Sequence, residues 1–173
     1  MRIRGRFVPA LALFFGLSIF AFAGDLKNER DDGSRAAGQG YVFFAPGAAV
    51  AERSSLGLAQ FGGGGEALIY KGAGIGAELS YVTPWSNYSA GIGLLSLDGS
   101  YHFARSRKIS PFVTGGYSLA FRQGHINLVN FGGGVNCWIS NRIGIRLELR
   151  DHVNRNAWTT IQYLSARIGL SFR

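Results

Sequence analysis

The stretch FGGGVNCWISNRIGIRLELR, residues 131–150, decides the fold. Apolar residues occupy every second position on both sides of Ser140-Asn141-Arg142, and glycine or polar residues fill most of the positions between them. Side chains at alternate positions of an extended strand point to opposite faces, and Ser and Asn are common in tight turns. The stretch therefore predicts a β-hairpin with one apolar and one polar face. The polar face of its second arm carries Arg146, Glu148 and Arg150.

The same two-residue period extends the prediction along the chain, and no helical period follows residue 24. Besides the two arms of the hairpin, strands are expected at about 39–45, 58–70, 73–82, 90–103, 111–121 and 160–172. The connections between them include 47–57, 83–89, 122–127 and 151–159 on one side and 71–72, 104–110 and 140–142 on the other. The predicted fold class is all-β, an eight-stranded antiparallel up-and-down barrel.

Alternation alone does not say which face of the barrel is outside. All three lysines lie outside the predicted strands, and the polar positions are mostly Gly, Ser, Thr and Asn, whereas a water-facing sheet normally carries Lys and Glu. From the third strand to the eighth, no charged residue shares the apolar face, and a charge on lipid costs ~2–4 kcal/mol at the membrane midplane. A transmembrane barrel with its apolar face on lipid is therefore expected. A soluble periplasmic ligand-binding barrel, with the faces reversed, is the alternative.

Aromatic residues concentrate near the ends of the predicted strands, as they do at the two interfaces of a membrane barrel. One interface is expected to carry Phe103, Phe112 and Phe172, and the other Tyr81, Trp85, Tyr88 and Phe121.

The chain before the barrel divides into two segments. Residues 1–23 have three arginines, an apolar run from Phe7 to Phe20 and an Ala21-Phe22-Ala23 cleavage site, which together predict a secretory signal peptide. A membrane anchor is the competing interpretation, but the run is short for the ~20 residues that a spanning helix needs. Residues 24–37 are polar and without periodicity, so a disordered periplasmic lead-in is expected there. The barrel then takes residues 38–173.

Composition agrees with this organisation. Only 16% of the 173 residues are charged, whereas 26 are glycine and 13% are aromatic, which fits a barrel in lipid better than a soluble enzyme. The formal net charge is +8, but no predicted strand has a clustered basic face, so nucleic-acid binding is not expected. Cys137 is the one cysteine and lies on the apolar face. We expect a monomer.

Six charged residues on the polar face lie at nearly the same distance from the periplasmic ends of their strands. They are Glu66, Glu78, Asp98, Arg146, Glu148 and Arg167. Unpaired buried charges are costly, so we predict a paired network inside the barrel, with Arg167 and Glu148 as its first pair. Together with Trp138 and Tyr163 the network is expected to fill the narrow interior and leave no open pore.

The signal segment, the hairpin GGGVNCWISNRIGIRLELRDHV and the last strand make the chain resemble the small OmpA/OmpX-like outer-membrane barrels. The strand from Leu164 to Phe172 resembles the C-terminal recognition signal of such barrels, although Arg173 follows the usual final Phe. The resemblance implies a place in a Gram-negative outer membrane, contact with its lipid, and insertion by the barrel-assembly machinery. Members of such families are variously structural, adhesive or enzymatic. The filled interior and the lack of a catalytic set favour a structural or surface-interaction role, with no enzyme activity and no cofactor expected.

Three motifs could support chemistry, and the first of them leaves an outer-membrane lipid-modifying hydrolase as a further alternative. The segment Asp151-His152-Val153-Asn154 resembles part of the site of outer-membrane lipid A deacylases, but Asn154 stands where a Ser nucleophile is expected, and Ser165 is distant. The residues His152 and Asn154 are instead expected at the rim of the barrel. The glycine runs 62–65 and 132–134 lack the Lys-Ser/Thr of a phosphate loop. The three histidines have no metal-ligand spacing, so no metal site is expected.

Overall fold

The computed structural model describes residues 38–51, 54–70, 72–103, 108–122, 124–155 and 160–173. The expected signal peptide and lead-in lie outside these residues. The described chain contains eight strands and the short 3-10 helix η1 (Tyr88–Ala90). The strands are β1 (Gly38–Ala51), β2 (Ser54–Tyr70), β3 (Ala73–Pro84), β4 (Ile92–His102), β5 (Ile109–Phe121), β6 (His125–Trp138), β7 (Ile143–Arg155) and β8 (Thr160–Phe172).

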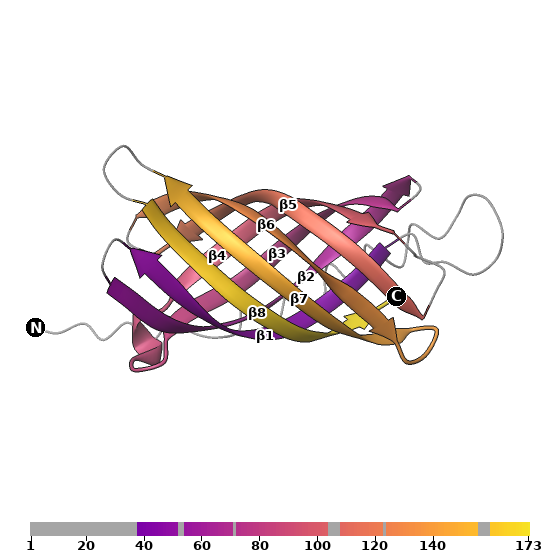
Figure 1. Cartoon of the computed structure of the whole chain (residues 1–173), viewed down its shortest axis with the longest axis horizontal. Coiled ribbons are helices and arrows are strands. Elements are labelled where there is room, and N and C mark those ends of the chain that lie inside the picture. Colours follow the sequence, from indigo (N-terminus) through magenta and orange to yellow (C-terminus); the bar gives the residue numbers. More distant parts are fainter. Residues whose placement is uncertain (1–37, 52–53, 71, 104–107, 123, 156–159) are drawn as a thin grey trace, which may run out of the picture.

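The strands form one closed barrel in chain order, and each is antiparallel to the next. The barrel closes through β8, which pairs with β1. Figure 1 shows the tilted strands and two distinct ends. We name the left-hand end, where β3 joins β4 and β7 joins β8, the loop end, and the opposite end, where β2 joins β3 and β6 joins β7, the turn end. The predicted fold class is confirmed.

Several strands are longer than predicted. β1 continues to Ala51 and β2 begins at Ser54, so most of the expected loop 47–57 is hairpin. β6 begins at His125 and β7 runs to Arg155, which takes part of two further expected loops into the sheet. The reason is that antiparallel strands go on exchanging backbone hydrogen bonds beyond the ~9–11 residues that cross lipid.

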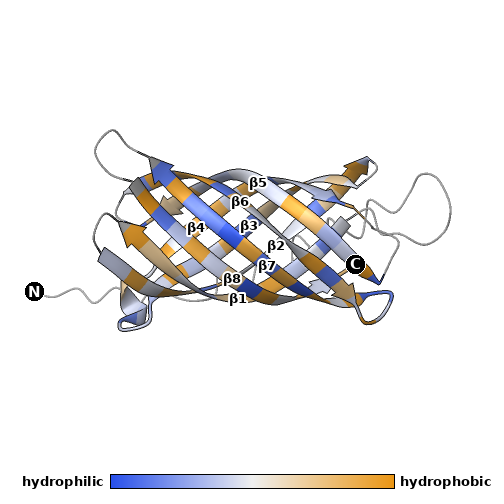
Figure 2. Cartoon of the chain, viewed as in Figure 1, coloured by the Kyte–Doolittle hydropathy of each residue, from blue (hydrophilic) through white to orange (hydrophobic). Residues whose placement is uncertain are grey.

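The outer face of the barrel is apolar. Figure 2 shows hydrophobic and hydrophilic residues alternating along the strands. Large hydrophobic side chains that point outward are exposed on every strand, among them Phe44, Leu97, Val113 and Ile168. A continuous apolar exterior of this kind is not stable in water. The alternative of a soluble barrel with reversed faces is therefore wrong.

Among the residues whose side chains the structure describes, one charged residue departs from the predicted apolar face. Because β7 extends past Arg150, Asp151 lies within the strand, on the outward side. It is buried, and its carboxylate accepts a hydrogen bond of 2.6 Å from the Gln162 side-chain amide on β8. The expectation of a charge-free outer face was therefore wrong here, near the loop end.

Aromatic side chains flank the exterior largely as expected. Trp85, Tyr88 and Phe121 are exposed at the loop end, and Phe103 is exposed at the turn end. Phe112 is the exception, because it is 2% exposed and lies inside the barrel. It shares the inward parity of Thr114, and this parity, rather than its place near a strand end, determines where its side chain goes.

Inward-facing glycines give the interior its room. A Cβ atom added at Gly116 would meet the Leu97 carbonyl oxygen and would lie 2.6 Å from Asp98 Oδ1. A Cβ at Gly134 would likewise meet the Leu147 carbonyl oxygen and would lie 2.8 Å from Glu148 Cα. The missing side chains therefore leave space for the charged neighbours on the adjacent strands.

Gly116→Ala is expected to lower the free energy of unfolding by about 1–3 kcal/mol, because overpacking forces neighbouring atoms to move. Gly115→Ala is the matched control, since its Cβ would point outward and meet nothing closer than 3.5 Å. Urea titration of both variants in lipid vesicles measures the difference. Equal stability of the two variants would contradict the role assigned to Gly116.

Candidate functional site in the barrel interior

Arg150 lies at the centre of a buried charge network. Its side chain is 1% exposed, and its guanidinium contacts carboxylates from three other positions on the barrel wall. Its Nη1 atom lies 2.6 Å from Asp98 Oδ2 and 3.7 Å from Glu78 Oε2, and its Nε donates to Glu148 Oε1 at 2.5 Å. Residues from β3, β4 and β7 are thereby joined across the interior.

Two further arginines complete the network. Arg167 Nη1 lies 2.8 Å from Glu78 Oε2 and 3.7 Å from Glu148 Oε1, while Arg146 Nε donates to Glu148 Oε2 at 2.9 Å. Three guanidinium groups therefore meet three carboxylates, Glu78, Asp98 and Glu148, and the formal charges cancel. Such pairing offsets the large cost of removing each ion from water.

The six residues predicted for the interior all lie there, but not in one cluster. Glu78, Asp98, Arg146, Glu148 and Arg167 belong to the network around Arg150. Glu66 lies apart, where its Oε1 is 2.6 Å from His102 Nε2 and also accepts a hydrogen bond from the Gln39 amide. The proposed first pair, Arg167 and Glu148, is in contact at 3.7 Å, yet the nearer carboxylate to Arg167 is that of Glu78.

Aromatic rings lie against two of the arginines. The Arg146 guanidinium carbon lies 3.9 Å from the ring centre of Phe112 and 4.4 Å from that of Tyr41. Arg167 lies 4.4 Å from the ring centre of Phe43. Cation–π contacts of desolvated arginines are favourable, so the rings stabilise charge as well as fill space.

A layer of uncharged polar side chains lies next to the network, toward the loop end. Gln60 accepts hydrogen bonds from the Tyr163 hydroxyl at 3.2 Å and from Arg167 Nη2 at 3.4 Å, and it donates to Ser80 at 2.8 Å. Asn130 donates to both Ser118 and Asp98 at 2.8 Å. This layer connects the charges to the loop-end half of the interior.

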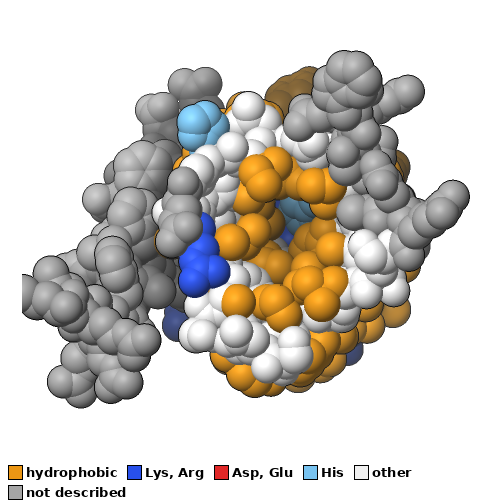
Figure 3. All heavy atoms as spheres, turned by 90° about the vertical axis from the view of Figure 1, so that its left-hand side faces the viewer, with side chains coloured by type: hydrophobic (Ala, Val, Ile, Leu, Met, Phe, Trp, Pro, Cys, Tyr) orange, Lys and Arg blue, Asp and Glu red, His pale blue; other side chains and the backbone are white. Residues whose placement is uncertain are grey.

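The loop-end half of the interior is apolar, although its inward positions were predicted to be polar. We name it the apolar cup. Its buried wall consists of Leu58, Val82, Leu94, Ala120, Leu128 and Tyr163. It surrounds a cavity of about 130 Å³ that opens at the loop end. Figure 3, viewed from the loop end, shows a hollow ringed by hydrophobic side chains, with a histidine in its depth.

A signal for the cup was present in the sequence. The wall residues share the inward parity of the charged residues, yet near the loop end of each strand that parity changes from polar to apolar: Leu94 precedes Ser96 and Asp98, and Ala120 follows Ser118. The prediction took the inward positions to be polar along the full length of each strand, and so it missed this change.

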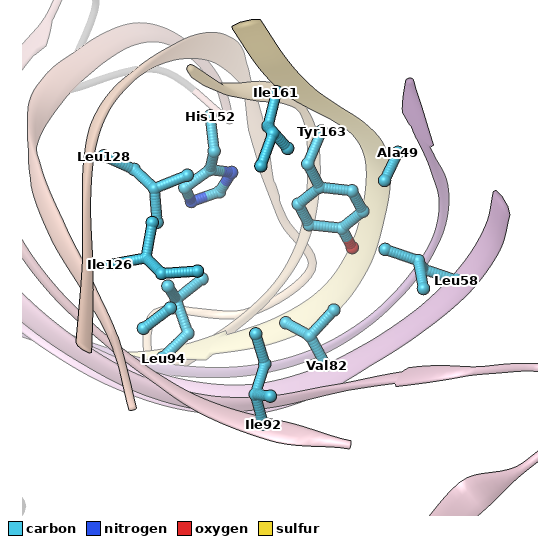
Figure 4. A pocket seen from close by; sticks show the side chains of 11 residues that line it. Ala49, Leu58, Val82, Ile92, Leu94, Ile126, Leu128, His152, Ile161 and Tyr163 are labelled. Carbon is cyan, nitrogen blue, oxygen red and sulfur yellow. The ribbon is translucent and has the colours of Figure 1, made fainter. Parts of the chain in front are cut away.

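His152 lies at the floor of the cup rather than at the rim, so the rim position predicted for it was wrong. Its ring is 1% exposed and stacks on the Tyr163 ring, with 5.6 Å between centroids and 25° between planes. Figure 4 shows both rings among the aliphatic side chains of the cavity. Neither imidazole nitrogen makes a hydrogen bond of normal geometry to the residues that the structure describes.

Among the described residues, the side chains around His152 are not arranged as a hydrolase triad. Asp151 points to the opposite face of β7, because adjacent strand residues alternate. The Ser165 hydroxyl donates to the Arg150 carbonyl oxygen at 3.3 Å, so it is not held by the imidazole. In the described ranges no three His, Cys, Asp or Glu side chains cluster as metal ligands, and no helix is long and apolar enough to cross a membrane.

The closed sheet, the apolar exterior and the paired charges inside define a small transmembrane β-barrel of the outer-membrane class. Three solved outer-membrane or surface proteins share this fold. Neisserial surface protein A has 10% sequence identity and a TM-score of 0.60, covering 82% of this chain and 99% of that one. The N-terminal β-barrel domain of OprF from Pseudomonas aeruginosa has 15% identity and a TM-score of 0.56, covering 78% and 98%.

Ail, the attachment invasion locus protein of Yersinia pestis, has 9% identity and a TM-score of 0.55, covering 78% of this chain and 97% of that one. A de novo designed transmembrane β-barrel is also similar, with a TM-score of 0.53 at 13% identity. At these identities the similarity shows the fold alone. No protein-family profile and no curated protein matches the sequence.

Proposed function

We propose that this protein is a non-catalytic outer-membrane barrel with a closed interior, whose loop end takes part in structural or surface interactions. The observation that carries the proposal is the buried network around Arg150. Its six charged side chains come from four strands and meet across the interior, where an eight-stranded barrel has little width beyond its own side chains.

Contacts at the loop end support a surface role. Arg122, next to β5, donates to the carbonyl oxygens of Ala90 at 2.7 Å and Ser89 at 3.0 Å, so two neighbouring connections are held together. A rim fixed in this way loses less conformational entropy on binding than a loose one. Two proteins of the same fold are named for the surface or for attachment, Neisserial surface protein A and Ail.

Purified protein in a planar lipid bilayer is expected to show no stepwise conductance, because hydrogen-bonded ion pairs occupy the cross-section. A general porin in the same bilayer provides the positive control. Stable conductance steps from the purified protein would contradict a closed interior.

The loop end is expected to face the cell exterior. In a Cys137→Ala background, a membrane-impermeant maleimide added to intact cells is expected to label Ser86→Cys, which is exposed near η1. Asn141→Cys, exposed in the turn between β6 and β7, is the matched control and is expected to react only after lysis. The reverse pattern would place the turn end outside and overturn the proposed orientation.

A further inference from the structure

We propose that the apolar cup is a binding site for a small uncharged molecule with an apolar body and one hydrogen-bonding group, which His152 holds. The inference goes beyond the proposed function, because the cup lies on the loop-end side of the charge network and would bind its ligand whether or not the barrel conducts.

The walls of the cup select an apolar body. Seven leucine, isoleucine and valine side chains line the cavity, together with Ala49, Ala120, His152 and Tyr163. A bound water needs two to four polar partners, and an apolar cavity of about 150 Å³ stays dry and binds benzene. Since the Tyr163 hydroxyl is already bound to Gln60, the described lining offers water little besides His152. At about 130 Å³ the cavity fits a body of roughly one ring.

The floor of the cup selects the polar group. His152 lines the cavity and is 1% exposed, and neither ring nitrogen makes a hydrogen bond of normal geometry to the described residues. Buried polar groups are normally hydrogen-bonded, so an unpartnered imidazole directed at a cavity indicates a missing partner. A neutral imidazole has one donor and one acceptor nitrogen, which matches a hydroxyl or carbonyl group.

The geometry also determines how the ligand lies. His152 stacks on Tyr163, and Tyr163 is tied through Gln60 to Arg167 and the charge network, so the floor has little freedom to move. Ile126 and Ile161 lie on the lining nearer the ends of β6 and β8 at the loop end. The polar group is therefore expected at the floor, with the apolar body between the aliphatic walls.

The test uses benzyl alcohol and toluene with the intact protein in lipid nanodiscs. Because both probes also enter lipid, binding is read from intermolecular NOEs to methyl groups. We expect NOEs to the inward methyls of Leu94 and Leu128 that saturate with probe concentration. The outward methyls of Leu95 and Leu97 report lipid partitioning. NOEs confined to outward methyls, or inward NOEs that never saturate, would overturn the proposal.

Two variants test the residues. Ala120→Phe is expected to fill the cup and abolish the saturable NOEs, whereas Leu95→Phe, on the outside, is expected to leave them unchanged. His152→Leu is expected to weaken benzyl alcohol binding roughly three- to tenfold and to leave toluene binding unchanged, since one hydrogen bond is lost. Folding of each variant is checked by its heat-modifiable gel mobility. Unchanged binding in Ala120→Phe, or equal losses for both probes in His152→Leu, would overturn the assignment.

Discussion

Arg150→Met is expected to lower the free energy of unfolding by about 3–5 kcal/mol, which is the cost of removing one partner from a buried ion pair. Methionine preserves much of the volume but removes the charge that Asp98, Glu78 and Glu148 share. Three buried carboxylates then face only two guanidinium groups. Urea unfolding in phospholipid vesicles, followed by tryptophan fluorescence, measures the loss.

Arg142→Met is the matched control, because Arg142 is exposed in the turn between β6 and β7. A change there is expected to stay within about 0.5 kcal/mol. Adding Asp98→Asn to Arg150→Met restores the balance of charges and is expected to recover about 0.5–3 kcal/mol. The network as described would be contradicted if Arg150→Met left the stability unchanged. It would also be contradicted if the double variant lost more stability than the two single variants added together.

Leu97→Arg is expected to lower the free energy of unfolding by about 2–4 kcal/mol, because it places a charge on the outward-facing side of β4, near the middle of the strand. Leu97 is 57% exposed on the outer face of β4, where lipid is its solvent. The same substitution at Ile139, which is 72% exposed at the turn end, is expected to cost about 0–1 kcal/mol near the interface. Unfolding of the two variants in lipid vesicles compares the free-energy cost of the arginine at the two depths.

Equal costs at the two positions would mean that Leu97 does not lie in the hydrocarbon. The contrast is specific to a membrane barrel, because both residues are more than half exposed and a water-soluble protein would tolerate either arginine. The contrast therefore tests which face of the barrel meets lipid.

The sequence predicted the closed eight-stranded sheet and its two faces because a period of two leaves a strong signal in residues such as Leu147 and Glu148. It placed Phe112 wrongly because nearness to a strand end was given more weight than parity. It ended β7 too early because Asp151 is charged, and only the Gln162 amide on the neighbouring strand explains how a carboxylate is accommodated there.

The interior was less predictable, since contacts there join residues far apart in the chain. Arg150 lies two positions farther from the turn end than Glu148, so it was not included in the predicted network. Its long side chain nevertheless reaches Asp98 on the opposite part of the barrel wall. His152 was assigned to the rim on the assumption that β7 ends at Arg150. Its position at the floor of the cup depends on the true length of β7 and on the stacking with Tyr163.

The origin of the interior charges has a consequence for assembly. Glu78 and Asp98 come from the first half of the barrel, and Arg146, Arg150 and Arg167 come from the last two strands. A sheet of β1 to β4 alone would hold carboxylates without counter-ions, and the later strands would carry excess positive charge. Closure of the barrel and neutralisation of its interior are therefore one event, which penalises half-formed sheets and makes insertion cooperative.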